Sequence, residues 1–382
     1  MLFGCDQPGD QLLKDGQGVL YQQNAEGSAY VVMGRGDFEG ANLVIPGTFN
    51  GMPVIGIAKC AFLHCDNLVS VSIPASVQYI GEEAFTKCDE LTTFNISDGS
   101  VLESIGAEAF YGCAKLGQIA IPATVKSIGF LAFSGCSSLE SAVIPDNSVL
   151  ESIGSLAFNE CAVLGEINVP DSVISIGTSA FLNCTALEYN VSGGGKYLGS
   201  VENPYTWFMG VTSTSVSELS VEEGCKHLYG FALNGCSALQ SLKLPNSLIS
   251  IESKALEGAS GLVYNVDGMG KYLGNDTNPY LVFVGLADSS ATEVAVNDDC
   301  EMIAPYALGA GASLTAVTIG ESVRYIGQYV FLGANSVQSV TFRCVEGWIA
   351  GSVEILSTEL SNTETAKQYV LSKYGSVEWK RS

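Results

Sequence analysis

The chain has 382 residues, of which 47% are hydrophobic and 15% are charged, so it carries enough apolar surface to fold. Its formal net charge is −23, from 40 acidic and 17 basic residues. A phosphate backbone would be repelled by this charge, which excludes nucleic acid as a partner. No apolar run approaches the ~18 residues that a transmembrane helix needs, so no membrane span is predicted.

The chain begins with a polar segment and a predicted hairpin. Residues 1–17 are interpreted as an N-terminal tether. Two apolar runs, Val19-Leu20-Tyr21 and Ala29-Tyr30-Val31-Val32, flank the turn-rich residues 24–27 and predict a β-hairpin. A first coil starts at Gly40. We therefore expect residues 18–67 to form an N-terminal β-hairpin cap and the first coil.

Residues 68–342 repeat one pattern at a nearly fixed spacing, which is typical of a repeat solenoid. One unit reads Leu68-x-x-Val71-x-Ile73-Pro74, then Val77-x-x-Ile80-Gly81-x-x-Ala84-Phe85-x-x-Cys88, and the string returns from Leu116 and from Leu164. With Gly40 the chain holds thirteen starts. The other twelve fall at positions 68, 91, 116, 139, 164, 187, 216, 239, 262, 291, 314 and 337.

Two units are longer than the rest, and part of the chain is a direct duplication. The long units span residues 187–215 and 262–290, and the duplication matches residues 185–259 to 260–334, so that each copy contains one long unit. The matching strings are Tyr189-Asn190-Val191 with 264–266, Gly195-Lys196-Tyr197-Leu198-Gly199 with 270–274, and Asn203-Pro204-Tyr205 with 278–280.

Each unit is predicted to form one coil of a β-rich solenoid. Apolar and exposed positions alternate from Val71 to Ile73, as in a half-buried strand, and Pro74 ends the strand because it lacks a ladder donor. One coil is too small to bury its own apolar face, so neighbouring coils must stack on it. We expect the inward positions of residues 68–342 to form one continuous column.

Residues 343–382 are predicted to form a C-terminal cap. The repeat pattern fades after Phe342, and residues 363–374 have helical spacing. Trp348 and Trp379 are expected to cover the last coil. An uncovered coil would expose its apolar ring and unpaired strand edges.

Nine of the twelve cysteines are predicted to be buried free thiols, not disulfides or metal ligands. Seven of them share one position of the repeat, where other coils carry Ala259, Gly311 and Ala334. A position that accepts Cys, Ala or Gly selects for a small apolar group. Parallel inward side chains also suit disulfide geometry poorly. The seven are Cys65, Cys88, Cys113, Cys136, Cys161, Cys184 and Cys236, and Cys225 and Cys300 are also expected to point inward.

No constellation for catalysis, metal binding or cofactor binding is found. The only histidines, His64 and His227, lie about six coils apart. No nucleophile elbow, metalloprotease helix or phosphate-binding loop is present. Carboxylates such as Glu103 and Glu151 have the spacing of a glycosidase pair, but any stack of like positions produces that spacing. We therefore predict that the chain is not an enzyme and uses no cofactor.

Two surfaces remain as candidates for binding. The outward positions of the strand ladder are small and rich in hydroxyl groups, which is typical of a solvated sheet face. The long units carry aromatic residues beside turns, and such residues can hold a sugar or a peptide, or can fit a hairpin into the solenoid wall. The candidate ligand-binding residues are Tyr197, Asn203, Tyr205, Trp207, Tyr272, Asn278 and Tyr280.

On these repeats the chain resembles the BspA-like leucine-rich-repeat surface proteins. The resemblance implies a right-handed leucine-rich-repeat coil. It also implies a secreted or cell-surface bacterial protein that binds a host or bacterial surface protein or glycan as an adhesin. We expect a monomer. The alternatives are a carbohydrate-processing enzyme accessory module and a passive structural spacer.

Residues Leu2-Phe3-Gly4-Cys5 are similar to a bacterial lipobox, in which the cysteine is acylated. Phe3 is atypical, and no hydrophobic stretch precedes the motif, so either the start is truncated or the match is due to chance. The polar residues after Cys5 favour lipidation of Cys5 in the native precursor, which would attach the protein to a membrane through a lipid anchor.

Overall fold

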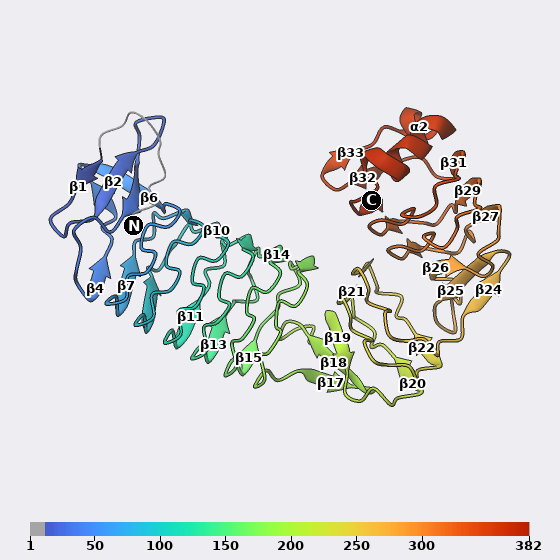
Figure 1. The fold of residues 1–382 in the computed structure, drawn as a ribbon, viewed down its shortest axis with the longest axis horizontal. Coiled ribbons are helices and arrows are strands. Elements are labelled where there is room, and N and C mark those ends of the chain that lie inside the picture. The colour runs from blue at the N-terminus through green and yellow to red at the C-terminus, as the bar shows by residue number, and fades with distance from the viewer. Residues whose placement is uncertain (1–11, 382) are drawn as a thin grey trace. The chain divides into compact units, whose positions relative to one another are not determined.

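A computed structural model describes residues 12–381, which form a solenoid of short strands with helices only near the C-terminus (Figure 1). Cys5 and most of the predicted tether lie outside the described residues. No helix among residues 12–381 combines the length and the apolar character needed to cross a bilayer.

The chain divides into two compact units, and the continuous column that we expected is interrupted. The first unit runs to Glu188 and also includes Gly199–Glu202, while the second comprises Tyr189–Leu198 and the chain from Asn203 onward. The parallel ladder of the first unit ends at β16, and a separate sheet begins with β17. The interruption arises because the first long unit inserts an antiparallel hairpin where a parallel strand would continue the ladder.

Two parallel ladders build the first unit, and both keep the predicted register. We call one of them the inner ladder and the other the outer ladder. In the inner ladder Ser104 pairs with Ser127, Ser127 with Ser152, and Ser152 with Ser175. The inner strands are β8 (Tyr79–Ile80), β10 (Ser104–Ile105), β12 (Ser127–Ile128), β14 (Ser152–Ile153) and β16 (Ser175–Ile176). The outer strands are β4 (Asn42–Val44), β7 (Ser70–Ile73), β9 (Thr93–Ile96), β11 (Gln118–Ala120), β13 (Ser141–Val143) and β15 (Glu166–Ile167).

The predicted N-terminal hairpin is confirmed. Strands β2 and β3 pair antiparallel, and β3 continues in parallel onto β6, which joins the hairpin to the inner ladder. The strands of this region are β1 (Leu13–Lys14), β2 (Leu20–Gln23), β3 (Tyr30–Gly34), β5 (Thr48–Phe49) and β6 (Met52–Ile57).

A stack of phenylalanine rings fills the centre of the first unit. Neighbouring rings lie 5.1 to 5.7 Å apart between centroids, and their planes differ by at most 10°. Every ring is buried. The repeat position after Ala therefore supplies one ring per coil to a continuous apolar stack, which consists of Phe62, Phe85, Phe110, Phe133, Phe158 and Phe181.

The cysteines of the repeat are buried and free, as predicted. Each thiol from Cys88 to Cys184 in the first unit lies 3.0 to 3.2 Å from the carbonyl oxygen of the phenylalanine in the preceding coil, as Cys136 does with Phe110. In the first unit the position thus uses a weak hydrogen-bond donor as well as a small side chain. Burial raises the pKa of the Cys136 thiol well above its usual value.

A thiol reagent is therefore expected to discriminate between cysteines in the native protein. At pH 8 we expect labelling of Cys344, which is partly exposed, and almost none of Cys136, because the thiolate is the reactive form and burial disfavours it. Mass spectrometry of digested protein, labelled with and without denaturant, measures this. Fast native labelling of Cys136 would contradict the buried position.

Close approach between coils requires glycine in the inner turn. A Cβ atom on Gly129 would lie 2.4 Å from the amide nitrogen of Ala107 and 2.5 Å from the carbonyl carbon of Gly106. These backbone atoms belong to the preceding coil and cannot move without separating the two coils. The glycine of the Ile-Gly string is thus a packing requirement.

Gly129→Ala is accordingly expected to lower the free energy of unfolding by about 1–3 kcal/mol, as overpacking does. Gly117→Ala is the matched control, since no heavy atom lies within 4 Å of a Cβ placed there. Thermal unfolding followed by circular dichroism compares the two variants. Equal melting temperatures would show that the coils can separate without cost.

The second unit contains two further sets of strands, each opened by a hairpin. The inner sheets contain β17 (Asn190–Ser192), β18 (Gly195–Leu198), β19 (Trp207–Val211), β21 (His227–Leu228) and β23 (Ser250–Ile251), then β24 (Asn265–Asp267), β25 (Gly270–Leu273), β26 (Val282–Leu286), β28 (Met302–Ile303) and β30 (Tyr325–Ile326). The outer strands are β20 (Glu218–Ser220), β22 (Ser241–Lys243), β27 (Glu293–Ala295), β29 (Ala316–Ile319) and β31 (Ser339–Phe342).

The C-terminal segment packs on the last coil of this unit. Strand β34 pairs antiparallel with β30 and so occupies its edge. Trp348 and Trp379 are buried and contact the ring of Phe342, and the predicted helix forms. The elements are β32 (Trp348–Ala350), β33 (Val353–Glu354), α1 (Ser357–Leu360), α2 (Thr363–Gln368), a π-helical turn η1 (Tyr369–Lys373) and β34 (Trp379–Arg381).

Candidate functional site

Three of the predicted ligand-binding residues belong to the core of the second unit. Tyr197, Trp207 and Tyr272 are completely buried. The Tyr197 hydroxyl accepts a hydrogen bond from the Glu222 backbone at 3.1 Å, and the Tyr272 hydroxyl accepts the equivalent bond from Asn297 at 3.0 Å. A ligand can reach these three side chains only if the coil opens.

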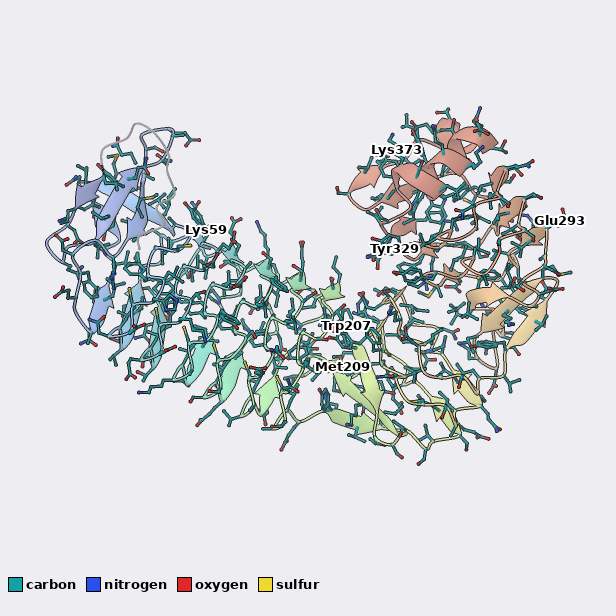
Figure 2. The ribbon with its side chains drawn as sticks, in the orientation of Figure 1. Lys59, Trp207, Met209, Glu293, Tyr329 and Lys373 are labelled. Atoms are coloured by element: carbon teal, nitrogen blue, oxygen red, sulfur yellow. The ribbon has the colours of Figure 1, made fainter. Side chains whose placement is uncertain are left out.

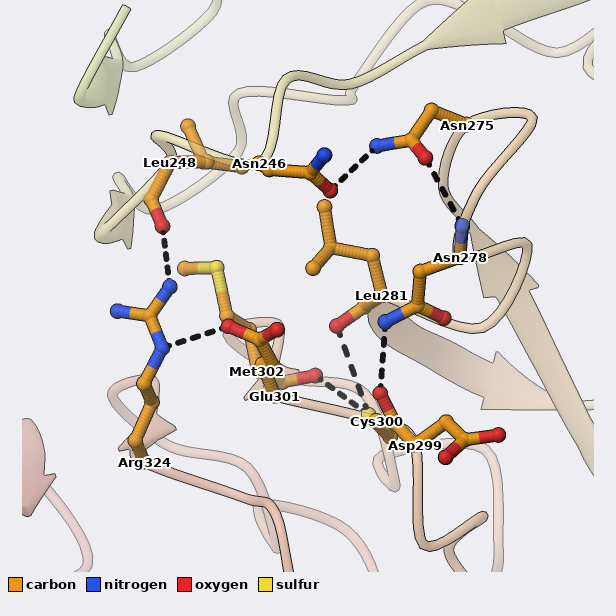
Figure 3. Close-up of polar contacts among 10 residues, drawn as sticks. All are labelled: Asn246, Leu248, Asn275, Asn278, Leu281, Asp299, Cys300, Glu301, Met302 and Arg324. Carbon is orange, nitrogen blue, oxygen red and sulfur yellow. Dashed lines mark hydrogen bonds and ion pairs between the residues drawn. The ribbon is translucent and has the colours of Figure 1, made fainter.

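The other four predicted residues, Asn203, Tyr205, Asn278 and Tyr280, are partly exposed and hold the loop after each hairpin. Figure 3 shows that the Asn278 amide donates to the Asp299 carbonyl, at 2.8 Å. Its side-chain oxygen accepts from the Tyr280 backbone at 3.0 Å, and Asn203 makes the equivalent bonds. Tyr280 packs edge-on against Tyr272, with 5.4 Å between ring centroids. In this structure these residues therefore join each loop to the next coil.

The outer face of each hairpin presents a different set of residues, which the sequence analysis did not select. In the first hairpin Val191 pairs with Lys196, and Tyr189 lies two residues before Val191. Because side chains two residues apart in an extended chain point to the same side, all three side chains share one face. Val191 is 60% exposed. The Lys196 ammonium lies 5.6 Å from the centre of the Tyr189 ring, within the range of a cation–π interaction.

The second hairpin repeats this arrangement. Val266 pairs with Lys271 and is 56% exposed, and the Lys271 ammonium lies 5.8 Å from the Tyr264 ring centre. We call the two sets, Tyr189, Val191 and Lys196, and Tyr264, Val266 and Lys271, the hairpin patches. Each patch combines an aromatic ring, an exposed aliphatic side chain and a cation on a short antiparallel hairpin.

A carboxylate lies beside the tip of each hairpin, although different residues supply it. In the first copy the Ser192 hydroxyl donates to Glu222 at 2.7 Å. In the second copy the Asn297 amide donates to Asp267 at 2.9 Å. Within the duplication, Asp267 occupies the position of Ser192, and Asn297 occupies the position of Glu222. The acidic and neutral partners have therefore exchanged positions, while one negative charge remains at each tip.

The turns of the first unit carry a shallow depression of about 590 Å³. The Lys87 ammonium lies 5.2 Å from the Tyr111 ring centre, and Lys115 forms an ion pair with Glu90 at 2.6 Å. These charged groups already interact with each other inside the depression.

No group of three or more His, Cys, Asp or Glu side chains with the geometry of a metal site occurs within residues 12–381. The two histidines lie in different surroundings. His64 is exposed on a turn of the first unit. His227 is buried in the second unit, where it stacks on Trp207 with 4.2 Å between ring centres and lies 2.6 Å from the Ser250 hydroxyl.

Several solved structures are similar to this chain. A leucine-rich cell surface protein from Faecalibacterium prausnitzii is 22% identical, with a TM-score of 0.42 over 90% of this chain and 97% of that protein. The pneumococcal vaccine antigen PcpA is 19% identical, with a TM-score of 0.45 over 94% and 96%. A leucine-rich repeat protein from Bacteroides ovatus is 24% identical, with a TM-score of 0.37 over 85% and 92%. The search of curated proteins found no match.

The repeat itself matches a family description, the BspA type leucine rich repeat region, in six copies. The matched residues are 56–188, 207–266 and 285–348, which is more than half of the chain. The first gap, between 188 and 207, contains β17 and β18, and the second, between 266 and 285, contains β25 and the loop that follows it. The chain belongs to the BspA-type leucine-rich repeat proteins.

Proposed function

We propose that this protein is a bacterial adhesin, displayed outside the cell, that holds a protein or glycan ligand through its two hairpin patches. One observation carries the proposal. The family repeat is interrupted twice, and a hairpin beside each interruption carries a partly exposed tyrosine, an exposed valine and a lysine on one face. A scaffold alone would need only the buried residues of these coils.

The chemistry of the patches fits binding. Tyrosine is enriched among the residues that dominate binding energy, because one ring offers both apolar contact and a hydroxyl group. Two equivalent patches in one unit also permit a repetitive ligand to engage both, which raises the overall affinity without new contacts. The earlier prediction that Asn203, Tyr205, Asn278 and Tyr280 contact ligand belongs to this proposal, since these residues border the hairpins.

The remaining parts of the proposal concern location and class. We propose a binding protein without catalytic activity, monomeric, and anchored to the membrane by a lipid on Cys5 in the native precursor. Membership of the BspA-type leucine-rich repeat family supports a location at the bacterial surface. The partly exposed tyrosines of the hairpin patches also favour a second candidate function, glycan capture as an accessory module of a carbohydrate-processing enzyme.

Probing arrays of glycans and matrix proteins with the purified chain tests the proposal. The double variant Tyr189→Ala with Tyr264→Ala is expected to lower the affinity for the bound probe by roughly tenfold or more. Because Tyr264 also packs against the core, binding is measured well below the melting temperature of the variant. The matched control is Tyr306→Ala with Tyr329→Ala, which removes two tyrosines of the second unit that are each 37% exposed and lie outside the hairpins, and which should leave the affinity unchanged. Wild-type binding by the first double variant would contradict the proposal.

A further inference from the structure

We propose that the outer edges of β17 and β24 receive an extended, basic segment of a protein partner as an added strand. The inference rests on the proposed function and names its ligand class. It concerns the backbone edge of each hairpin, in addition to the side chains of the hairpin patches.

The position of the two strands supplies the first step. β17 is the terminal strand of a five-stranded sheet, and β24 is the terminal strand of an eight-stranded sheet. Both lie in the second unit. On β24 all three residues, Asn265, Val266 and Asp267, are exposed. A terminal strand offers a row of backbone donors and acceptors to whatever pairs with it.

The register shows which backbone groups face outward. Ser192 pairs with Gly195 across a two-residue loop, and Asp267 pairs with Gly270 in the same way. Residues that flank such a loop hydrogen-bond to each other, and the next residue along the strand turns its N–H and C=O to the other side. Val191 and Val266 are those next residues. Each edge therefore presents one donor and one acceptor beside an exposed aliphatic side chain.

This combination selects a polypeptide. An extended chain supplies N–H and C=O groups at the spacing of a β-ladder, and its alternate side chains can contact Val191 or Val266. A glycan lacks that regular alternation of donor and acceptor. Proteins commonly protect an edge with proline or lysine, and the three residues of each edge strand include neither.

Charge indicates the composition of the partner segment. A carboxylate stands at each hairpin tip, as Glu222 or as Asp267. A second exposed carboxylate opens the outer strand that follows each hairpin, as Glu218 in β20 and Glu293 in β27. Figure 2 shows Glu293 on the outer side of the second unit. Lysine or arginine in the partner would complement these groups.

The same charges disfavour a second copy of this chain as the occupant. Two copies that paired edge to edge would each carry a formal net charge of −23, and net charge of the same sign on both partners opposes their association. The partner is therefore a different protein with a basic extended segment.

Fluorescence anisotropy with the full chain tests the inference. The probe is a labelled nonapeptide that alternates lysine with valine or threonine. It is compared with a form N-methylated at alternate backbone nitrogens and with a form that carries glutamate in place of lysine. We expect the parent to bind, and we expect both modified peptides to bind roughly tenfold more weakly or worse. Val191→Pro with Val266→Pro should weaken parent binding to a similar degree.

A second variant and the array results distinguish failure of the strand-addition inference from failure of the proposed function. Glu222→Gln with Asp267→Asn leaves the edge strands intact and should weaken the lysine peptide while reducing the salt dependence of its binding. No parent binding at about 1 mM, or equal binding of the N-methylated form, would overturn the strand-addition inference. If the Tyr189 and Tyr264 double variant still loses array binding in that case, the proposed function stands without the strand-addition inference. If the variants of the hairpin patches keep array binding and the variants of the edge strands keep peptide binding, both the proposed function and the strand-addition inference are overturned.

Discussion

Phe133→Ala is expected to lower the free energy of unfolding of the first unit by about 3–5 kcal/mol. Phe133 is completely buried, and its ring lies 5.1 Å from that of Phe110 and 5.2 Å from that of Phe158. The substitution removes ring contacts on both sides and leaves a cavity that a regular stack of coils cannot close by local rearrangement. Because each coil contacts only its neighbours, the loss should open the adjoining coils first.

The same coil provides the control for this prediction. Phe130 belongs to the turn just before Phe133 and is 46% exposed, so Phe130→Ala should change the free energy of unfolding by no more than about 0.5 kcal/mol. Urea unfolding followed by circular dichroism measures both variants, and hydrogen exchange locates the coils that open. Similar midpoints for the two variants would show that the phenylalanine stack does not hold the unit together.

Positions such as Phe133 and Cys136 could be predicted from the sequence because the repeat fixes their direction. A residue that recurs at the same place in each coil must occupy the same place in the stack, so its burial follows from the register alone. The N-terminal hairpin and the helix near the C-terminus were also predictable, because alternation and helical spacing are local signals.

The hairpin residues could not be assigned in this way. Tyr189 and Tyr197 are both aromatic residues of the same long unit, yet Tyr197 is completely buried and Tyr189 is partly exposed. The unit departs from the repeat, so the register no longer says which face a residue occupies. The signal that could have found the patch was the alternation of Tyr189 with Val191, which places both on one face, opposite the side chain of Asn190.

Long-range contacts set the burial of several other positions. In β10 to β16 of the first unit the first residue of the strand is a partly or fully exposed serine, at Ser104 to Ser175, but the equivalent Trp207, His227 and Ser250 of the second unit are buried. In the second unit Tyr325 reaches back to the Ile251 carbonyl, at 3.1 Å, although the two residues lie far apart in the sequence. No local pattern encodes a contact of that separation.

The same part of the second unit contains a partly buried carboxyl group, that of Glu252, whose ionisation opposes folding. Burial raises the pKa of Glu252 to about 7, the negative charge of Glu378 adds to the rise, and Lys380 partly offsets it. Tyr325 lies between these elements, with its hydroxyl 2.9 Å from the Glu378 carboxylate. The folded state therefore prefers Glu252 protonated.

The sign of the pH dependence follows from proton binding. Between the ordinary pKa of glutamate, near 4.5, and about 7, the folded chain binds more protons at Glu252 than the unfolded chain does. The Glu252 contribution to stability is then most favourable below about pH 4.5, falls as the pH rises, and is fully lost above about pH 7. The difference amounts to about 3 kcal/mol at most.

Glu252→Gln should abolish this dependence, because the amide stays neutral at every pH. We expect the variant to be more stable than the parent by about 2–3 kcal/mol at pH 8 and nearly equal to it at pH 4.5, as measured by urea unfolding of the second unit. Glu257→Gln removes an exposed carboxylate of the same coil and is the control, for which the parent profile should persist. A Glu252→Gln profile parallel to that of the parent would show that the Glu252 carboxylate is as well solvated in the folded chain as in the unfolded one.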